Sequence, residues 1–99
     1  MHVTELAIDA HSGFDVKRAI EEVAAELGLV ATMRSTLAQY PGCTHWHFKR
    51  GKDRGVLEAT YWPSENRAWL SYRAGRDAEW IPDAIREFQR LVEQRARMP

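Results

Sequence analysis

Alternation of apolar and polar residues between Cys43 and Arg73 is the feature that most constrains the fold of this chain. Three segments, 44–50, 55–62 and 67–73, place apolar side chains at every second position. Successive side chains of a strand point to opposite faces of a sheet, so this period predicts three β-strands, each with one apolar face. Turn-forming residues separate them, namely Gly51-Lys52-Asp53-Arg54 and Pro63-Ser64-Glu65-Asn66. The stretch is therefore predicted to be an antiparallel meander.

Tight turns at these two places would fix how the three strands pair. Phe48 then lies opposite Leu57, Trp46 opposite Ala59, and Ala59 opposite Leu70. With these pairs, the apolar sets of all three strands fall on one face. A slip of one residue would turn a whole set to solvent, so the agreement among the strands supports this register.

Helical periodicity flanks the meander on both sides. Ser12 is predicted to be the N-cap of a first helix that reaches about Leu27, with Gly28 just beyond its end. A second helix is predicted from about Ile81 to Arg95, with Pro82 in its first turn. Both have an apolar stripe at spacings of three and four residues, made of Val16, Ile20, Val23, Ala24 and Leu27 in the first and of Ile81, Ile85, Phe88 and Val92 in the second.

A further strand is predicted at Val30–Tyr40, where the alternation is less regular. Pro41-Gly42 is typical of a type II turn, which would pair Leu37 with Trp46 and Thr36 with His47. The N-terminal residues 1–11 include Val3, Leu6 and Ile8, whose alternation is irregular. They predict either a weak edge strand or a flexible end.

Length and composition favour one soluble domain over residues 1–99. A chain of 99 residues can bury one hydrophobic core. We find no apolar run long enough to cross a bilayer and no secretory signal at the N-terminus, so no membrane contact is expected. Cys43 is the only cysteine, which excludes an intrachain disulfide and is typical of a reducing compartment. We therefore expect a cytoplasmic protein.

Together these elements predict an α+β fold in two layers. A four-stranded antiparallel meander, with an extra N-terminal edge strand if residues 1–11 form one, has both helices packed on one face, in the order (β)-α-β-β-β-β-α. The other face is left to solvent, as in many antiparallel sheets. The predicted core consists of Ile20, Val23, Leu27, Leu37, Trp46, Phe48, Leu57, Tyr61, Leu70, Tyr72, Ile85, Phe88 and Val92.

The face opposite the helices has an unusual composition for a solvated surface. Its predicted cross-strand rows are Tyr40/Cys43/Trp62/Arg67, Ala38/His45/Thr60/Trp69, Thr36/His47/Glu58/Ser71 and Arg34/Lys49/Val56/Arg73. Aromatic cross-strand pairs can serve sheet stability alone, but clustered aromatics with a polar rim are also typical of interaction sites. The candidate binding residues are Arg34, Tyr40, His45, His47, Lys49, Glu58, Trp62, Arg67, Trp69 and Arg73.

We expect a non-enzymatic module that binds through this face, with itself as a homodimer or with another protein. The charge distribution favours such association. Residues 30–76 contain eight Lys/Arg and three Asp/Glu, a net charge of +5, and the remainder of the neutral chain therefore has a net charge of −5. Segments of opposite charge can orient a partner or a second copy.

Two further hypotheses use the same residues. Single-stranded nucleic acid would stack on Tyr40, Trp62 and Trp69 and place its phosphates against the basic side chains. Alternatively, His45 and His47 on one strand, with Glu58 on the next, can supply three ligands to a metal such as zinc.

No cofactor and no catalytic residue is predicted. Thr36, His47 and Glu58 would place a hydroxyl, an imidazole and a carboxylate in line, which is the order of nucleophile, base and orienting group. The sequence indicates no oxyanion hole to accompany them. A binding role is therefore favoured over an enzymatic one.

Overall fold

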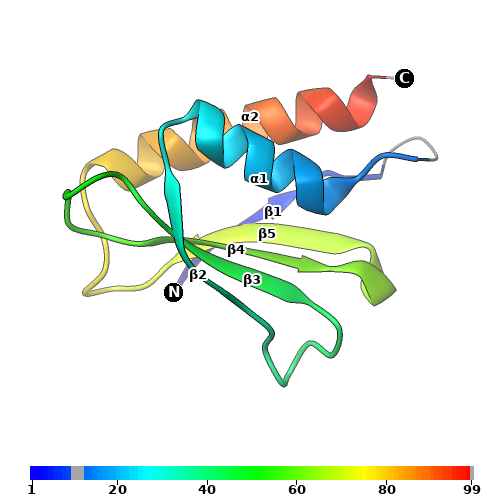
Figure 1. Cartoon of the computed structure of the whole chain (residues 1–99), viewed down its shortest axis with the longest axis horizontal. Helices are drawn as coiled ribbons and strands as arrows, with labels where there is room; N and C mark the ends of the chain where they lie inside the picture. The colour runs from blue at the N-terminus through cyan, green and yellow to red at the C-terminus, as the bar shows by residue number, and fades with distance from the viewer. Residues whose placement is uncertain (10–12, 99) are drawn as a thin grey trace.

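The computed structural model describes residues 1–9 and 13–98, which form an antiparallel sheet with two helices on one face (Figure 1). The elements are β1 (His2–Leu6), α1 (Val16–Glu26), β2 (Val30–Ser35), β3 (Thr44–Lys49), β4 (Leu57–Trp62), the short 3₁₀ helix η1 (Pro63–Glu65), β5 (Arg67–Tyr72) and α2 (Trp80–Arg97). The predicted α+β class and element order are confirmed. The sheet has five strands because the N-terminal segment joins it.

The N-terminal strand β1 lies at one edge of the sheet, whose order is β1-β5-β4-β3-β2. It pairs antiparallel with β5, from His2 opposite Tyr72 to Leu6 opposite Ala68. Just beyond the strand, the Ala7 amide donates a hydrogen bond of 2.9 Å to the Glu93 carboxylate of α2. Residues 2–6 are therefore an edge strand, and the chain that follows them is bonded to the C-terminal helix.

The predicted register of the central strands is confirmed. Phe48 lies opposite Leu57, and Ala59 lies between Trp46 and Leu70. All five side chains face the helices and are at most 2% exposed. The tryptophan is also bonded to the helical layer, because its indole Nε1 donates to the Glu21 carboxylate of α1 at 3.1 Å.

Most of the predicted core is buried, with corrections at a few positions. Leu27, Tyr61 and Tyr72 are only partly buried and pack against the core from its margin. Leu37 was wrongly assigned, since it lies in the loop after β2. The sequence-based core also omitted Leu6 of β1, Ile8 just after that strand, Leu29 in the connection between α1 and β2, and Trp80 and Ile81 at the start of α2.

Strand β2 is where the sequence-based prediction was wrong. It ends at Ser35 rather than Tyr40, and an irregularity between Ala31 and Met33 shifts its register. Consequently Met33 lies opposite His47, and Arg34 lies opposite Trp46. The physical reason is the connection to β3. Residues 36–43 form a long loop with two successive turns, closed by hydrogen bonds from Tyr40 N to Leu37 O and from Cys43 N to Tyr40 O, instead of one tight turn.

The ends of α1 confirm one predicted signal and correct another. Ser12 lies outside the described residues. The observed N-cap is Asp15, whose carboxylate accepts a hydrogen bond from the Arg18 amide at 3.0 Å. At the other end, Gly28 lies just beyond the helix as predicted, with a positive φ of 74°. The amides of Gly28 and Leu29 donate to the carbonyls of Ala25 and Ala24, which is a Schellman motif.

The turn between β3 and β4 is held against the start of α2. The Trp80 indole donates to the Arg54 carbonyl at 2.8 Å, and the Val56 amide donates to the Arg76 carbonyl at 2.8 Å. Between these bonds, Gly55 has a φ of 102°. A Cβ atom there would lie 2.7 Å from Ala78 Cβ and 3.0 Å from Ile81 Cδ1. The two segments approach this closely because residue 55 has no side chain.

We therefore expect Gly55→Ala to destabilise the fold by about 3 kcal/mol or more, because strain at positive φ adds to overpacking. Gly51→Ala is the matched control, since it also has positive φ in the same turn but no atom within 4 Å of the added methyl group. It should cost only about 1 kcal/mol. Urea unfolding of both variants measures the difference, and equal losses would contradict the close packing at residue 55.

Candidate functional site

The candidate site is the open face, by which we mean the face of the sheet opposite α1 and α2. Partners in an antiparallel register share a face, so the observed pairing defines its rows. Two rows cross all five strands, Glu5/Trp69/Thr60/His45/Ser35 and Val3/Ser71/Glu58/His47/Met33. The parts of these rows on β3, β4 and β5 match the sequence-based prediction. The parts on β2 do not, and β1 extends each row by one residue.

An aromatic cluster occupies one end of the open face. The ring of Tyr40, from the β2–β3 loop, lies 5.0 Å from the rings of both Trp62 and Trp69. The Trp62 indole donates to the Pro41 carbonyl at 3.1 Å, and the Arg67 guanidinium stacks 4.8 Å above the Trp69 ring. Trp69 is consequently only 7% exposed. These contacts cover Trp69 almost completely, whereas Tyr40 and Trp62 are partly buried by one another.

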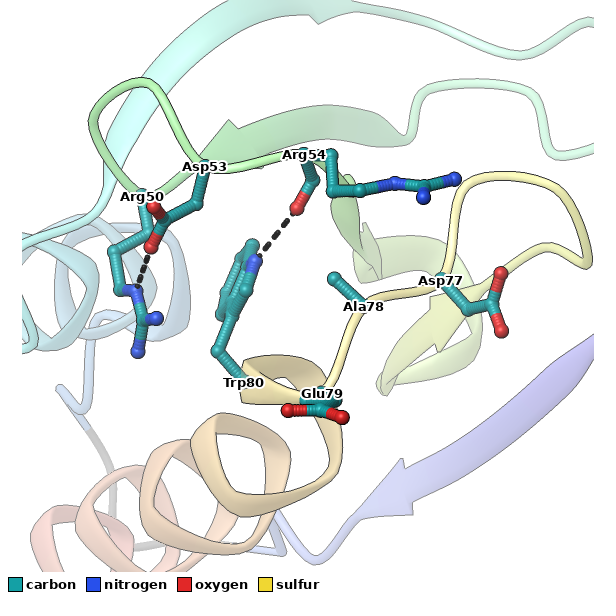
Figure 2. Close-up of a pocket in the computed structure, with 7 residues that line it drawn as sticks. All are labelled: Arg50, Asp53, Arg54, Asp77, Ala78, Glu79 and Trp80. Atoms are coloured by element: carbon teal, nitrogen blue, oxygen red, sulfur yellow. Dashed lines mark hydrogen bonds and ion pairs between the residues drawn. The ribbon is translucent and has the colours of Figure 1, made fainter.

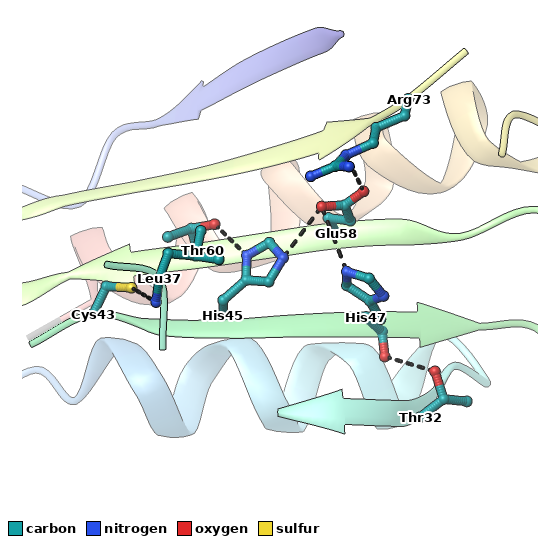
Figure 3. A network of polar contacts seen from close by, with 8 residues as sticks. All are labelled: Thr32, Leu37, Cys43, His45, His47, Glu58, Thr60 and Arg73. Atoms are coloured by element: carbon teal, nitrogen blue, oxygen red, sulfur yellow. Dashed lines mark hydrogen bonds and ion pairs between the residues drawn. The ribbon is translucent and has the colours of Figure 1, made fainter. Parts of the chain in front are cut away.

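A buried carboxylate lies at the centre of the open face, on the central strand (Figure 3). Glu58 is 1% exposed, and its Oε1 lies 3.2 Å from Nε2 of His45 and 3.6 Å from Nε2 of His47. On its other side, Oε2 lies 3.5 Å from Nε of Arg73. A carboxylate buried this deeply needs compensating partners, and these three side chains supply them.

The hydrogen bonds of His45 set its orientation. Its Nδ1 lies 2.8 Å from the Thr60 hydroxyl, while its Nε2 faces Glu58. One neutral tautomer satisfies both contacts, with Nε2–H donating to the carboxylate and the hydroxyl donating to Nδ1. The Glu58 atom Oε2 is buried without a hydrogen bond in the described part of the chain, and only the longer ion pair to Arg73 reaches it.

Both imidazoles are held in the neutral state. Desolvation lowers the pKa of His45 below its ordinary 6.5, and this outweighs the opposing charge of Glu58. Desolvation also lowers the pKa of His47, assisted by the positive charges of Arg76 and Arg73. At neutral pH the centre of the open face therefore contains one carboxylate, two neutral imidazoles and the cationic Arg73.

The structure places most of the sequence-predicted site residues on this face, with one clear exception. Arg34 points the other way, because it lies opposite Trp46 and forms an ion pair of 3.0 Å with Glu21 of α1. The predicted row of Arg34, Lys49, Val56 and Arg73 does not form. Lys49 instead pairs with Val30 at the margin, and Val56 precedes β4.

The catalytic line considered from the sequence is also absent. Thr36 lies beyond the end of β2, and the residue opposite His47 is Met33. Cys43 is 1% exposed and does not join the histidines; its Sγ accepts a hydrogen bond from the Leu37 amide at 3.3 Å. Of that line, the described residues thus keep the His47 imidazole and the Glu58 carboxylate together, without the Thr36 hydroxyl.

Residues at the edges of the open face were missed by the sequence analysis. Val3 and Glu5 come from β1, whose position beside β5 could not be inferred from its irregular pattern. Val30 and Met33 come from β2, where the shifted register changes which side chains face outward. Glu5 forms a two-contact pair with Arg67, with a shortest distance of 2.8 Å. The apolar side chains at the two edges therefore became evident only from the pairing.

A separate open pocket of about 700 Å³ lies between the β3–β4 turn and the start of α2 (Figure 2). Its charged side chains have both signs, since Arg50 and Arg54 face three acids, Asp53, Asp77 and Glu79. Arg50 is paired with Asp53 at 2.7 Å, and the Trp80 indole is occupied by the Arg54 carbonyl. Two of its polar side chains and the indole are thus engaged within the protein, its remaining charges are of mixed sign, and we assign it no binding role.

Comparison with models of protein families, with curated proteins and with solved structures finds no match to this chain. Among the described residues, neither helix combines the length and the apolar character needed to span a bilayer.

The neutral imidazoles predict a pH-dependent stability. A histidine whose pKa is lowered by folding binds its proton more readily in the unfolded chain. The contribution of the neutral imidazole to the free energy of unfolding is therefore complete above pH 6.5, the ordinary pKa of histidine. It decreases as the pH falls toward the lowered pKa of the folded state. We expect the midpoint of urea unfolding to fall between about pH 7.5 and about pH 5.5. The dependence should be weaker in the variant with both His45→Gln and His47→Gln.

His2→Gln is the control for this measurement, because His2 is exposed on β1. It should leave the pH dependence of wild type intact. An unfolding midpoint that is constant over this pH range in the wild type would contradict the neutral state of the two imidazoles.

Proposed function

We propose that the protein is a non-enzymatic binding module that associates with a second copy of itself through the open face. The observation that supports this proposal is the position of its exposed apolar side chains. Val3, Val30 and Met33 are 51%, 60% and 37% exposed, and they are the exposed large hydrophobic side chains in the described strands. Their partners Ser71, Lys49 and His47 place all three on the open face.

The arrangement of these side chains is self-complementary. Val3 and Met33 lie at opposite ends of the row that passes through Glu58 on the central strand. A two-fold axis parallel to β4 would bring Val3 of one copy opposite Met33 of the other, and the same contact would occur twice. Closed two-fold dimers with such isologous contacts are the commonest homo-oligomers.

Charge pairing within the open face is compatible with its burial. Glu5 is paired with Arg67 and Glu58 with Arg73, so two acids and two of the basic side chains neutralise each other within one chain. A second copy can then approach without burying these charges unpaired, which would be costly. Lys49 lies at the margin, where it can remain in water. The single buried Cys43 thiol fits a reducing compartment, and we place this association in the cytoplasm.

Single-stranded nucleic acid is less well supported as the occupant. Stacking of bases requires free aromatic faces. Here Trp69 is 7% exposed beneath Arg67, and Tyr40 contacts both tryptophans. The anchors are therefore the aliphatic side chains at the edges rather than the aromatic cluster.

Two lysines at the edges should separate the dimer. Val3→Lys together with Met33→Lys places charge in the contact but alters only exposed side chains, so the monomer should keep its fold. The control is Ala25→Lys with Gln94→Lys, which adds the same charge at exposed helical positions. Light scattering should give a dimer for wild type and control and a folded monomer for the edge variant. A wild-type monomer at high concentration would refute self-association.

The two-fold axis can be tested by cross-linking. Stacked sheets lie about 10 Å apart, which is too far for a disulfide but within reach of a short bis-maleimide. In a chain with Val3→Cys and Met33→Cys, we expect cross-links between position 3 of one copy and position 33 of the other. The native Cys43 is buried and should stay unmodified. Peptide mapping that finds only links between identical positions would contradict this axis.

A further inference from the structure

Three potential metal ligands converge at the centre of the open face. The Nε2 atoms of His45 and His47 and a carboxylate oxygen of Glu58 lie within 4.8 Å of one another. The carboxylate oxygen is 3.2 Å from one nitrogen and 3.6 Å from the other. In a tetrahedral site with bonds of 2.0–2.1 Å, neighbouring ligand atoms are separated by about 3.3 Å. The two observed distances lie on either side of that value. The third separation, between the two imidazole nitrogens, is at most 4.8 Å, so binding a metal would also require the imidazoles to move closer together.

The backbone supports this arrangement rigidly. His45 and His47 are two residues apart on β3, so both project from the same face, and Glu58 lies directly opposite His47 on the central strand. All three come from paired strands in the middle of the sheet rather than from loops. Ligands on such elements are held near their binding geometry before the metal arrives.

The surrounding groups can orient the ligands. In the other neutral tautomer of His45, Nδ1–H donates a hydrogen bond to the Thr60 hydroxyl, 2.8 Å away, and leaves Nε2 free to bind a metal. Arg73 lies on the side of Oε2, whereas both imidazoles lie on the side of Oε1. Metal-binding carboxylates are commonly bonded in this way through their second oxygen.

We propose that His45, His47 and Glu58 bind a divalent first-row transition metal, with Zn²⁺ as the reference ion, and leave a further coordination position for water or a ligand. Two imidazoles and one carboxylate are a donor set suited to such ions, and sites with three protein ligands keep an open position. This inference does not depend on self-association, because all three ligands come from one chain.

Nearby positive charge limits the affinity of this site. Arg73 forms an ion pair with the same carboxylate, and the charge of Arg76 acts on His47. A dication would be repelled by both. We therefore expect Arg76→Gln to bind the metal more tightly than wild type, because it removes a like charge and leaves the three ligands in place.

Titration of untagged protein with Zn²⁺, followed by calorimetry, tests the proposal, and Co²⁺ serves as a spectroscopic probe of the ligands. Wild type should bind one ion per chain and show the absorption bands of tetrahedral Co²⁺. His47→Ala and Glu58→Gln should each lose at least about tenfold in affinity, since even outer-shell changes have effects of this size. The control His2→Ala removes an imidazole elsewhere and should bind as wild type does.

Thermal unfolding provides a readout that remains valid if a variant is less stable. A metal that binds only the folded chain raises the melting temperature, and a chelator reverses the increase. We expect this shift in wild type and in His2→Ala, and a smaller shift in the edge variant with Val3→Lys and Met33→Lys, because Met33→Lys adds a positive charge opposite His47. We expect a smaller shift in folded Glu58→Gln, whose side chain has nearly the same shape as that of glutamate.

Either of two results would overturn the metal proposal: no binding of Zn²⁺ or Co²⁺ by wild type, or binding that is unchanged in both His47→Ala and Glu58→Gln. Binding by the monomeric edge variant separates this question from self-association. If that variant still binds the metal, failure to detect a wild-type dimer would leave the metal site intact.

Discussion

The register of β4 between β3 and β5 determines the character of both layers of this protein. Leu57 and Ala59 point toward the helices and have no exposed surface, whereas Glu58 and Thr60 point to the open face and are each 1% exposed. A slip of one residue would exchange the two sets and bury a carboxylate against α1 and α2. Because burying an unpaired charge is far more costly than losing one apolar contact, this strand strongly favours a single register.

The same constraint explains which parts of the fold can be predicted from the sequence. Strands β3, β4 and β5 alternate between strongly different side chains, so their pairing follows from the pattern alone. Strand β2 has no such pattern, since Val30, Ala31, Thr32, Met33 and Arg34 are all exposed at this edge of the sheet. Nothing in its composition distinguishes one register from another. The irregularity near Thr32 and the length of the loop were therefore not predictable from residue types.

Strand β1 illustrates a different limit. Its partner, β5, lies more than sixty residues away in the chain, so no turn between them fixes the pairing. Its place at the sheet edge follows from tertiary contacts, such as the burial of Leu6 and Ile8 and the bond from Ala7 to Glu93. The cluster of His45, His47 and Glu58 was predictable because it depends on β3 and β4 alone. The exposed apolar side chains at the two edges were not, because they depend on β1 and β2.

The side chains at the centre of the open face are buried, although no helix covers this face in the described part of the chain. The side chains at its centre shield one another laterally. His45 contacts Thr60, Glu58 and His47, and Tyr40 with Arg67 covers Trp69. Such a network contributes little net stability compared with apolar side chains of similar volume, because each polar group must be desolvated. A stabilising role alone is therefore a weak explanation for an ionisable cluster at this position, which favours a role in binding.

The two proposed activities of the open face would be thermodynamically coupled if both occur. A metal bound by Glu58 and the two histidines would lie on the floor of the surface that a second copy covers, with its open coordination position facing that copy. If dimerisation changes the affinity for the metal by some factor, the metal must change the dimerisation constant correspondingly. Whether metal binding and dimerisation favour or oppose each other depends on what occupies that open coordination position. A ligand donated by the second copy would make the coupling favourable, whereas exclusion of the metal's water without a replacement would make it unfavourable. Because Val3 and Met33 lie in the same cross-strand row as Glu58, a change at the centre of that row can act on the contacts at its two ends.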